Sequence, residues 1–87
     1  MPSQKSSFEA VDHELREACA FLHAFSHGRR GFTRRDVLAG IGRVTGLCEH
    51  LETRFASGPT APKLKRAIAS AREHIAEAKA RLALLQA

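Results

Sequence analysis

A cysteine and two histidines recur at four-residue intervals in the segment CAFLHAFSH, as Cys19, His23 and His27. On an α-helix this spacing places side chains on adjacent turns of one face, where they can approach one another. A thiolate and two imidazoles can bind a transition metal or heme iron, so these residues form a candidate metal or heme site. The chain has no CxxC or HExxH motif, and solvated histidines on a helix surface are the alternative.

The segment SHGRRGFTRRD concentrates positive charge in the middle of the chain. Its four arginines are Arg29, Arg30, Arg34 and Arg35. Arg34 and Arg35 follow Thr33, the expected N-cap of a helix, where each positive charge opposes the helix dipole by about 0.3–1 kcal/mol. A bound anion would relieve this conflict, and Asp36 or a carboxylate of a second subunit could do the same. The arginine cluster therefore predicts contact with an acidic partner, with a solvated turn as the alternative.

A second basic group begins the third predicted helix, and the whole chain is basic. This group consists of Lys63, Lys65 and Arg66. The chain has 14 lysines and arginines against 9 aspartates and glutamates, a net charge of +5, which favours acidic proteins or duplex DNA as partners. Stacking on single-stranded nucleic acid is poorly supported, because Trp and Tyr are absent.

No combination of residues points to catalysis. The close carboxylate pairs, Glu14 with Glu17 and Glu49 with Glu52, are typical of charged helix surfaces, and a thin bundle offers no large pocket that could activate them. We therefore expect no enzyme activity. No apolar run approaches the roughly 18 residues of a membrane span, so we expect a cytoplasmic protein with no membrane partner.

Three amphipathic segments must position these residues. In each segment, apolar residues alternate at spacings of three and four, which places them on one helix face. The first stripe is Phe8, Val11, Leu15, Ala18, Leu22 and Phe25; the second is Val37, Ile41, Val44, Cys48, Leu51 and Phe55; the third is Leu64, Ile68, Ala71, Ile75, Ala78, Leu82 and Leu85. They predict an all-α, antiparallel three-helix bundle with helices at about 7–27, 34–56 and 61–86, in one domain spanning 1–87 with a flexible N-terminus at 1–6.

Capping residues mark the expected helix ends. Two pairs have the spacing of a capping box: Ser6 with Glu9, and Thr33 with Asp36. Phe32 precedes the second cap and can pack on Val37 as a hydrophobic staple. Gly28 suits the left-handed turn that ends the first helix, and Gly58 with Pro59 ends the second.

Three glycines, Gly40, Gly42 and Gly46, lie inside the second predicted helix, where each costs about 1 kcal/mol relative to alanine. Ala39, Gly42 and Gly46 share a face that points away from the apolar stripe. This small-residue face predicts contact with a second copy of the chain, as a homodimer or higher oligomer. A helix broken or bent between Gly40 and Gly46 is the alternative.

The same region can also be read as a helix-turn-helix. In FTRRDVLAGIGRVTGLCEHL, a short helix would reach a glycine turn, and RVTGLCEHL would enter the major groove of DNA. The apolar stripe from Val37 to Phe55 opposes this interpretation, because its spacing passes through the supposed turn without a change of phase.

The two cysteines are expected to be reduced thiols. In an antiparallel pair of helices, Cys19 lies level with about residue 42, which leaves Cys48 about 9 Å further along the axis. A disulfide does not span that offset without movement of the backbone. Cys48 is best explained as a small core residue.

Together these observations predict a small, non-enzymatic helical interaction or adaptor protein that forms homo-oligomers and binds an acidic partner through its arginine cluster. A DNA-binding transcriptional regulator that uses the same cluster with Lys63, Lys65 and Arg66 is the alternative. The third hypothesis is a metal or heme sensor built on Cys19 and the two histidines. The sequence requires no cofactor.

Overall fold

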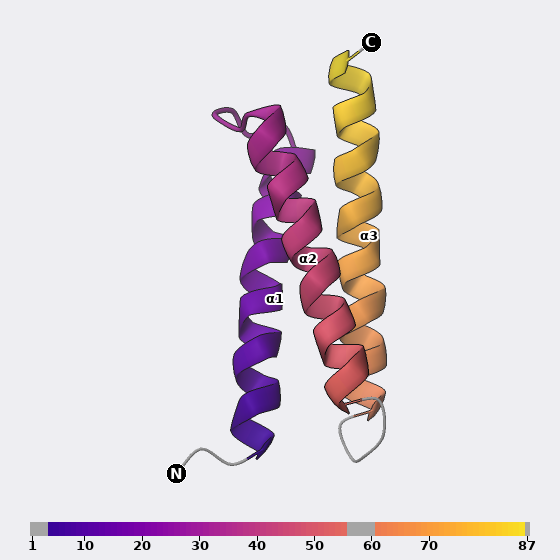
Figure 1. Ribbon diagram of the computed structural model, residues 1–87. Coiled ribbons are helices and arrows are strands. Elements are labelled where there is room, and N and C mark those ends of the chain that lie inside the picture. The colour runs from indigo at the N-terminus through magenta and orange to yellow at the C-terminus, as the bar shows by residue number, and fades with distance from the viewer. Residues whose placement is uncertain (1–3, 56–60, 87) are drawn as a thin grey trace.

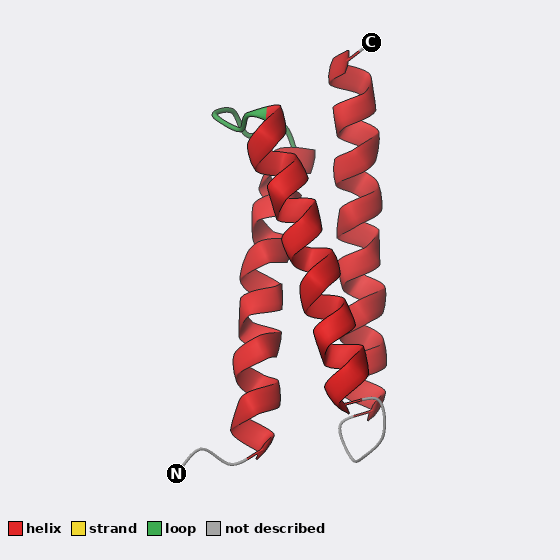
Figure 2. Ribbon diagram, in the orientation of Figure 1, coloured by secondary structure: helices red, strands yellow, loops and turns green. Residues whose placement is uncertain are grey.

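Three α-helices make up the part of the chain that the computed structural model describes, residues 4–55 and 61–86. α1 spans Gln4–Ser26, α2 spans Arg34–Phe55 and α3 spans Ala61–Gln86, and no strand occurs within these residues. The helices run up, down and up, and each contacts the other two (Figure 1). Within the described residues, Figure 2 shows loop only between α1 and α2. An all-α three-helix bundle is therefore confirmed.

The core consists of the three predicted stripes. Its most deeply buried large side chains are Leu15, Leu22, Val37, Val44 and Leu51. One predicted core position is wrong, because the side chain of Leu85 is 62% exposed. α3 continues beyond the end of α1 and the start of α2, so no helix lies beside its last turn (Figure 1). None of the helices, over the described residues, combines the length and hydropathy needed to cross a lipid bilayer.

The N-terminal end of α1 differs from expectation. The helix begins at Gln4, so Ser6 lies inside it and is not its N-cap, and the capping box with Glu9 is wrong. Gln and Lys are good helix formers, and nothing in this segment stops the helix. Residues 4–6 of the expected flexible segment are therefore helical. Residues 1–3 lie outside the described residues, as do Gly58 and Pro59.

The turn between α1 and α2 is closed by capping motifs at both ends. Gly28 adopts a φ of 88°, its N–H donates to Phe25 O at 3.1 Å, and the N–H of Arg29 donates to Ala24 O at 3.1 Å. These two bonds form a Schellman motif, which confirms the predicted C-terminal role of Gly28. Gly31 also adopts a left-handed φ of 97°. The backbone of the turn is thus fixed where it leaves the C-terminus of α1.

The second end of the turn is held by the predicted capping box. The N–H of Asp36 donates to Thr33 Oγ1 at 3.1 Å, and the N–H of Thr33 donates to Asp36 Oδ2 at 3.4 Å. Phe32 is half-buried and packs edge-on against Phe21, with ring centroids 4.8 Å apart. It is also edge-on to Phe25 at 5.8 Å, while its contact with Val37 stays a prediction.

α2 is one continuous helix through its glycines. This excludes the break between Gly40 and Gly46, and it makes the helix-turn-helix interpretation wrong, because no turn separates two helices there. Gly40 faces α1: a Cβ added at this position would lie 3.0 Å from ring carbons of Phe21. A Cβ at Gly42 or Gly46 would meet no atom within 4 Å.

Substitution by alanine should therefore change the free energy of unfolding differently at Gly40 and at Gly42. Gly42→Ala removes the cost of a helical glycine and should raise the free energy of unfolding by about 0.5–1 kcal/mol. Gly40→Ala should gain less than this or lose stability, because the new methyl group presses on the Phe21 ring. Urea unfolding followed by circular dichroism measures both. Equal gains at the two positions would contradict the close approach of α1 at Gly40.

Candidate functional site

The α1–α2 loop and the first turn of α2 place the four predicted arginines at one end of the bundle, and all four are exposed. Arg34 and Arg35 are the first two residues of α2. The carboxylate of Asp36, considered above as their internal counter-charge, accepts the N–H of Thr33 and so serves the helix cap. For Arg29, Arg30 and Arg35, no ion pair occurs within the residues that the structure describes.

A fifth arginine, Arg81 of α3, approaches the same loop from the neighbouring helix. A Cβ at Gly28 would lie 3.7 Å from a terminal nitrogen of the Arg81 guanidinium. Its Nε is buried and has no hydrogen-bond partner among the described residues. Such an unsatisfied buried donor costs about 1–3 kcal/mol. The nearby C-terminus of α1 attracts a cation, which offsets part of this cost.

Arg81 was missed in the sequence. It stands one turn before Leu85 and beside Leu82, so it flanks the apolar stripe of α3, and this position was the available signal. Its place beneath the loop depends on how far α3 is shifted along its axis relative to α1. Helical periodicity does not determine that shift, because any shift along the axis leaves the stripe on the same face.

The second basic group lies at the opposite end of the bundle. The start of α3 exposes Lys63, Lys65 and Arg66, whereas the α1–α2 loop lies toward the other end of α3 (Figure 1). The long dimension of the molecule is 47 Å. The fold therefore does not join the two predicted basic groups into one compact site.

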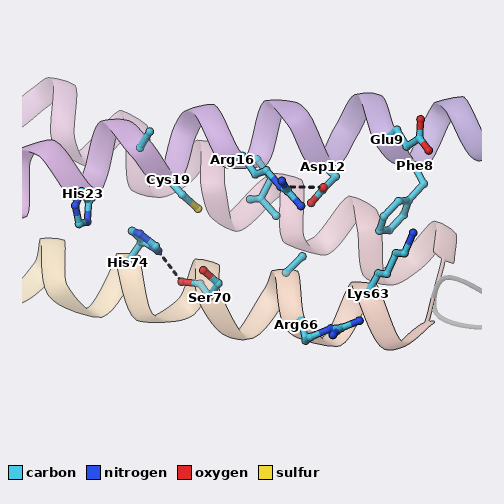
Figure 3. A pocket seen from close by; sticks show the side chains of 13 residues that line it. Phe8, Glu9, Asp12, Arg16, Cys19, His23, Lys63, Arg66, Ser70 and His74 are labelled. Atoms are coloured by element: carbon cyan, nitrogen blue, oxygen red, sulfur yellow. Dashed lines mark hydrogen bonds and ion pairs between the residues drawn. The ribbon is translucent and has the colours of Figure 1, made fainter.

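A groove of about 900 Å³ runs between α1 and α3 near this second end. Figure 3 shows Phe8 and Cys19 of α1 facing Lys63, Arg66 and Ser70 of α3 across it. Its charges are mixed, because Arg16 pairs with Asp12 at 3.1 Å and Glu9 also lines it. Lys63 and Arg66 therefore share the groove with carboxylates.

Three histidines cluster where α1 and α3 adjoin. The ring centroids of His23 and His27 are 4.0 Å apart, and His74 of α3 lies 5.7 Å from His23. Nδ1 of His27 is 3.0 Å from His23 O, and Nδ1 of His74 is 2.8 Å from Ser70 O. If these nitrogens carry the protons, Nε2 of each ring is the free acceptor.

The predicted metal ligands are only partly brought together. His23 and His27 are neighbours on the exposed surface, whereas Cys19 is 8% exposed and belongs to the core. Burial, followed by the charges of Cys48 and Asp12, raises the pKa of the Cys19 thiol, which opposes a role as a thiolate ligand. Within the described residues no three His, Cys, Asp or Glu side chains could hold a metal ion as they stand. The metal or heme hypothesis stays a prediction.

Both cysteines are buried free thiols, as expected. Cys48 is 6% exposed, which confirms its predicted place in the core. Its pKa is raised, first by burial and then by Glu52 and Glu49, while Arg72 acts in the opposite direction. The two thiols are therefore held in the protonated form, which is weakly nucleophilic.

Comparison of the chain with protein-family models, curated proteins and solved structures gives no match.

The raised pKa values of Cys19 and Cys48 make stability depend on alkaline pH. Below the ordinary thiol pKa of about 8.5, the thiols are protonated in both the folded and the unfolded chain. Their contribution to the free energy of unfolding is then fully present. Above this pKa, the unfolded chain ionises first, so the free energy of unfolding should fall until the folded thiols also ionise. Urea unfolding in a reducing buffer from pH 7.5 to 10 should show a steeper loss for the native sequence than for the Cys19→Ala, Cys48→Ala variant. Parallel pH profiles would refute the raised pKa values.

Proposed function

We propose that the protein is a small, non-enzymatic interaction protein that self-associates and binds an acidic protein partner through the arginine loop, meaning Arg29, Arg30, Arg34 and Arg35. The observation that carries this proposal is the uneven distribution of carboxylates. On the flanks of the bundle, arginines have carboxylate neighbours: Arg16 with Asp12 at 3.1 Å, Arg72 with Glu52 at 3.7 Å and Arg43 with Glu14 at 4.0 Å. For Arg29, Arg30 and Arg35, no carboxylate lies within ion-pair distance among the described residues.

The backbone of the loop supports recognition because it is held before any partner arrives. The Schellman motif at Gly28 and the capping box at Thr33 close the turn, and Phe32 anchors it to α1. Ordering a loop on binding costs free energy, and a loop that is already fixed avoids most of that cost. The arginines thus extend from a backbone that is already ordered, although their long side chains still lose rotamer freedom on binding.

An acidic protein surface is favoured over duplex DNA as the partner. A duplex that contacted both basic ends would lie along a bundle whose helices all carry carboxylates between those ends, and these would repel phosphates. They include Glu14 and Glu17 of α1, Glu49 and Glu52 of α2, and Glu73 and Glu77 of α3. A partner that binds one end avoids this repulsion.

The two buried thiols give no support to an enzyme that uses a cysteine nucleophile. The groups with a shifted pKa in the described residues are Cys19 and Cys48, and both are shifted toward the weakly nucleophilic thiol. No catalytic pair of the kind that requires an activated nucleophile is supported by this arrangement.

The charge of the loop can be tested with matched variants. One variant carries Arg29→Gln, Arg30→Gln and Arg35→Gln; the control carries Lys63→Gln, Lys65→Gln and Arg66→Gln, and each loses three positive charges. Fluorescence anisotropy would follow a labelled decaglutamate peptide and a labelled duplex of about 20 base pairs at about 50 and 200 mM salt. The loop variant should bind the peptide at least about tenfold more weakly, or ~1.4 kcal/mol, whereas the control should change little.

Other outcomes of this experiment reject the proposal. Equal losses in both variants would mean that net charge, rather than the loop, governs binding. Duplex binding that is tighter than peptide binding and is lost in the loop variant would favour the DNA-binding regulator instead.

Self-association is proposed to use the small-residue face of α2, formed by Ala39, Gly42 and Gly46. All three are exposed, and open space lies beyond Gly42 and Gly46, so a second helix could approach closely. Gly46→Leu should shift sedimentation-equilibrium mass toward the monomer by filling this surface. Ala76→Leu adds a leucine at an exposed position on α3, outside this face, and should leave the mass unchanged. A native chain that is monomeric, or a Gly46→Leu chain of native mass, would reject this contact.

A further inference from the structure

A pocket of about 400 Å³ lies beneath the α1–α2 loop, between the loop and the last turns of α3. Its walls combine two chemistries. Phe25, Phe32 and Leu85 provide apolar surface, and three arginines provide charge: Arg29, Arg30 and Arg81. No carboxylate is among the described residues that line it. An apolar pocket with a few convergent charged groups is the usual form of a specific binding site.

The Nε–H of Arg81 makes no hydrogen bond to the end of α1. The carbonyls of Ala24 and Phe25 already accept the N–H groups of Arg29 and Gly28, and His23 O accepts the N–H of His27. The buried Nε–H of Arg81 is left without an acceptor in the described chain. This Nε–H is enclosed by the protein, so a ligand in the pocket can reach Arg81 only through its terminal nitrogens.

The chemistry of the ligand follows from the shape of the guanidinium. The two terminal nitrogens of Arg81 form a planar fork that matches the two oxygens of a carboxylate. Arg29 and Arg30 add positive charge that favours the ionised form. The exposed side of Leu85, which no helix covers, adjoins the same pocket and offers contact to an apolar side chain. The pocket thus fits an acidic residue with an apolar neighbour.

We propose that this pocket is a specificity subsite in which Arg81 binds one carboxylate side chain of the acidic partner while Phe32 and Leu85 contact the apolar residue next to it. The inference rests on the proposed function, because the loop must first bind an acidic protein. It adds Arg81 of α3 to the binding site. It also requires an apolar residue in the partner, in addition to negative charge. A purely acidic peptide satisfies the loop, whereas a peptide of mixed glutamate and leucine also fills the pocket.

Two labelled peptides test this subsite: decaglutamate, and a peptide of equal charge with leucines next to its central glutamates. The native chain should bind the leucine-containing peptide at least about tenfold more tightly, a difference of ~1.4 kcal/mol. Arg81→Lys keeps the charge but removes the planar fork, so it should abolish this preference while binding of decaglutamate stays within about twofold. Arg72→Lys, on the same helix, is the matched control and should behave as the native chain.

A second readout follows the peptide titration on the native chain itself. The Nε–H resonance of Arg81, identified by its absence in Arg81→Lys, should shift when the leucine-containing peptide is added to the native chain. An unmoved resonance, or equal preference in Arg81→Lys and the native chain, would overturn the subsite. A shift with inorganic phosphate but not with the peptide would reject a partner side chain as the ligand. If the native chain binds neither peptide in a way that depends on the loop arginines, the proposed function itself is rejected.

Discussion

A thin bundle can bury only one narrow face of each helix, and this constraint shapes the rest of the molecule. The buried stripes meet in a single apolar core, and within the described residues no polar or charged side chain other than a thiol is buried in it. Every charge is therefore displaced to the flanks or the ends. On the flanks, carboxylates and arginines mix. At the α1–α2 end, Arg29, Arg30 and Arg35 have no ion-pair partner among the described residues.

Closure of the core at that end connects packing with recognition. Phe25 and Phe32 cover the end of the core and hold the loop down through edge-on ring contacts. Gly28, which adopts the left-handed φ that ends α1, lies beside the Arg81 guanidinium. The same packing that seals the core thus traps a positively charged group beneath the loop, with a donor that the described chain does not satisfy.

The spacing of apolar residues and the capping pairs predicted the helices and the α1–α2 turn well. They could not predict how far each helix is shifted along its axis relative to the others. The three-four spacing located the stripes, and the Thr33–Asp36 pair formed the expected cap. The offset of α3 along the bundle depends on packing between distant segments. It exposed Leu85, placed Arg81 beneath the loop and brought His74 beside His23. Likewise, only tertiary packing distinguishes a glycine that meets α1 from those that face open space.

The central claim is that an acidic partner binds at the arginine-loop end, and a map of the contact in solution tests it most directly. Backbone amide resonances of the labelled protein would be recorded during titration with the leucine-containing glutamate peptide. The account predicts that shifts concentrate at residues 28–36 and 81–85, with little change at residues 61–70. Shifts centred on the groove between α1 and α3, or spread evenly along the bundle, would contradict it.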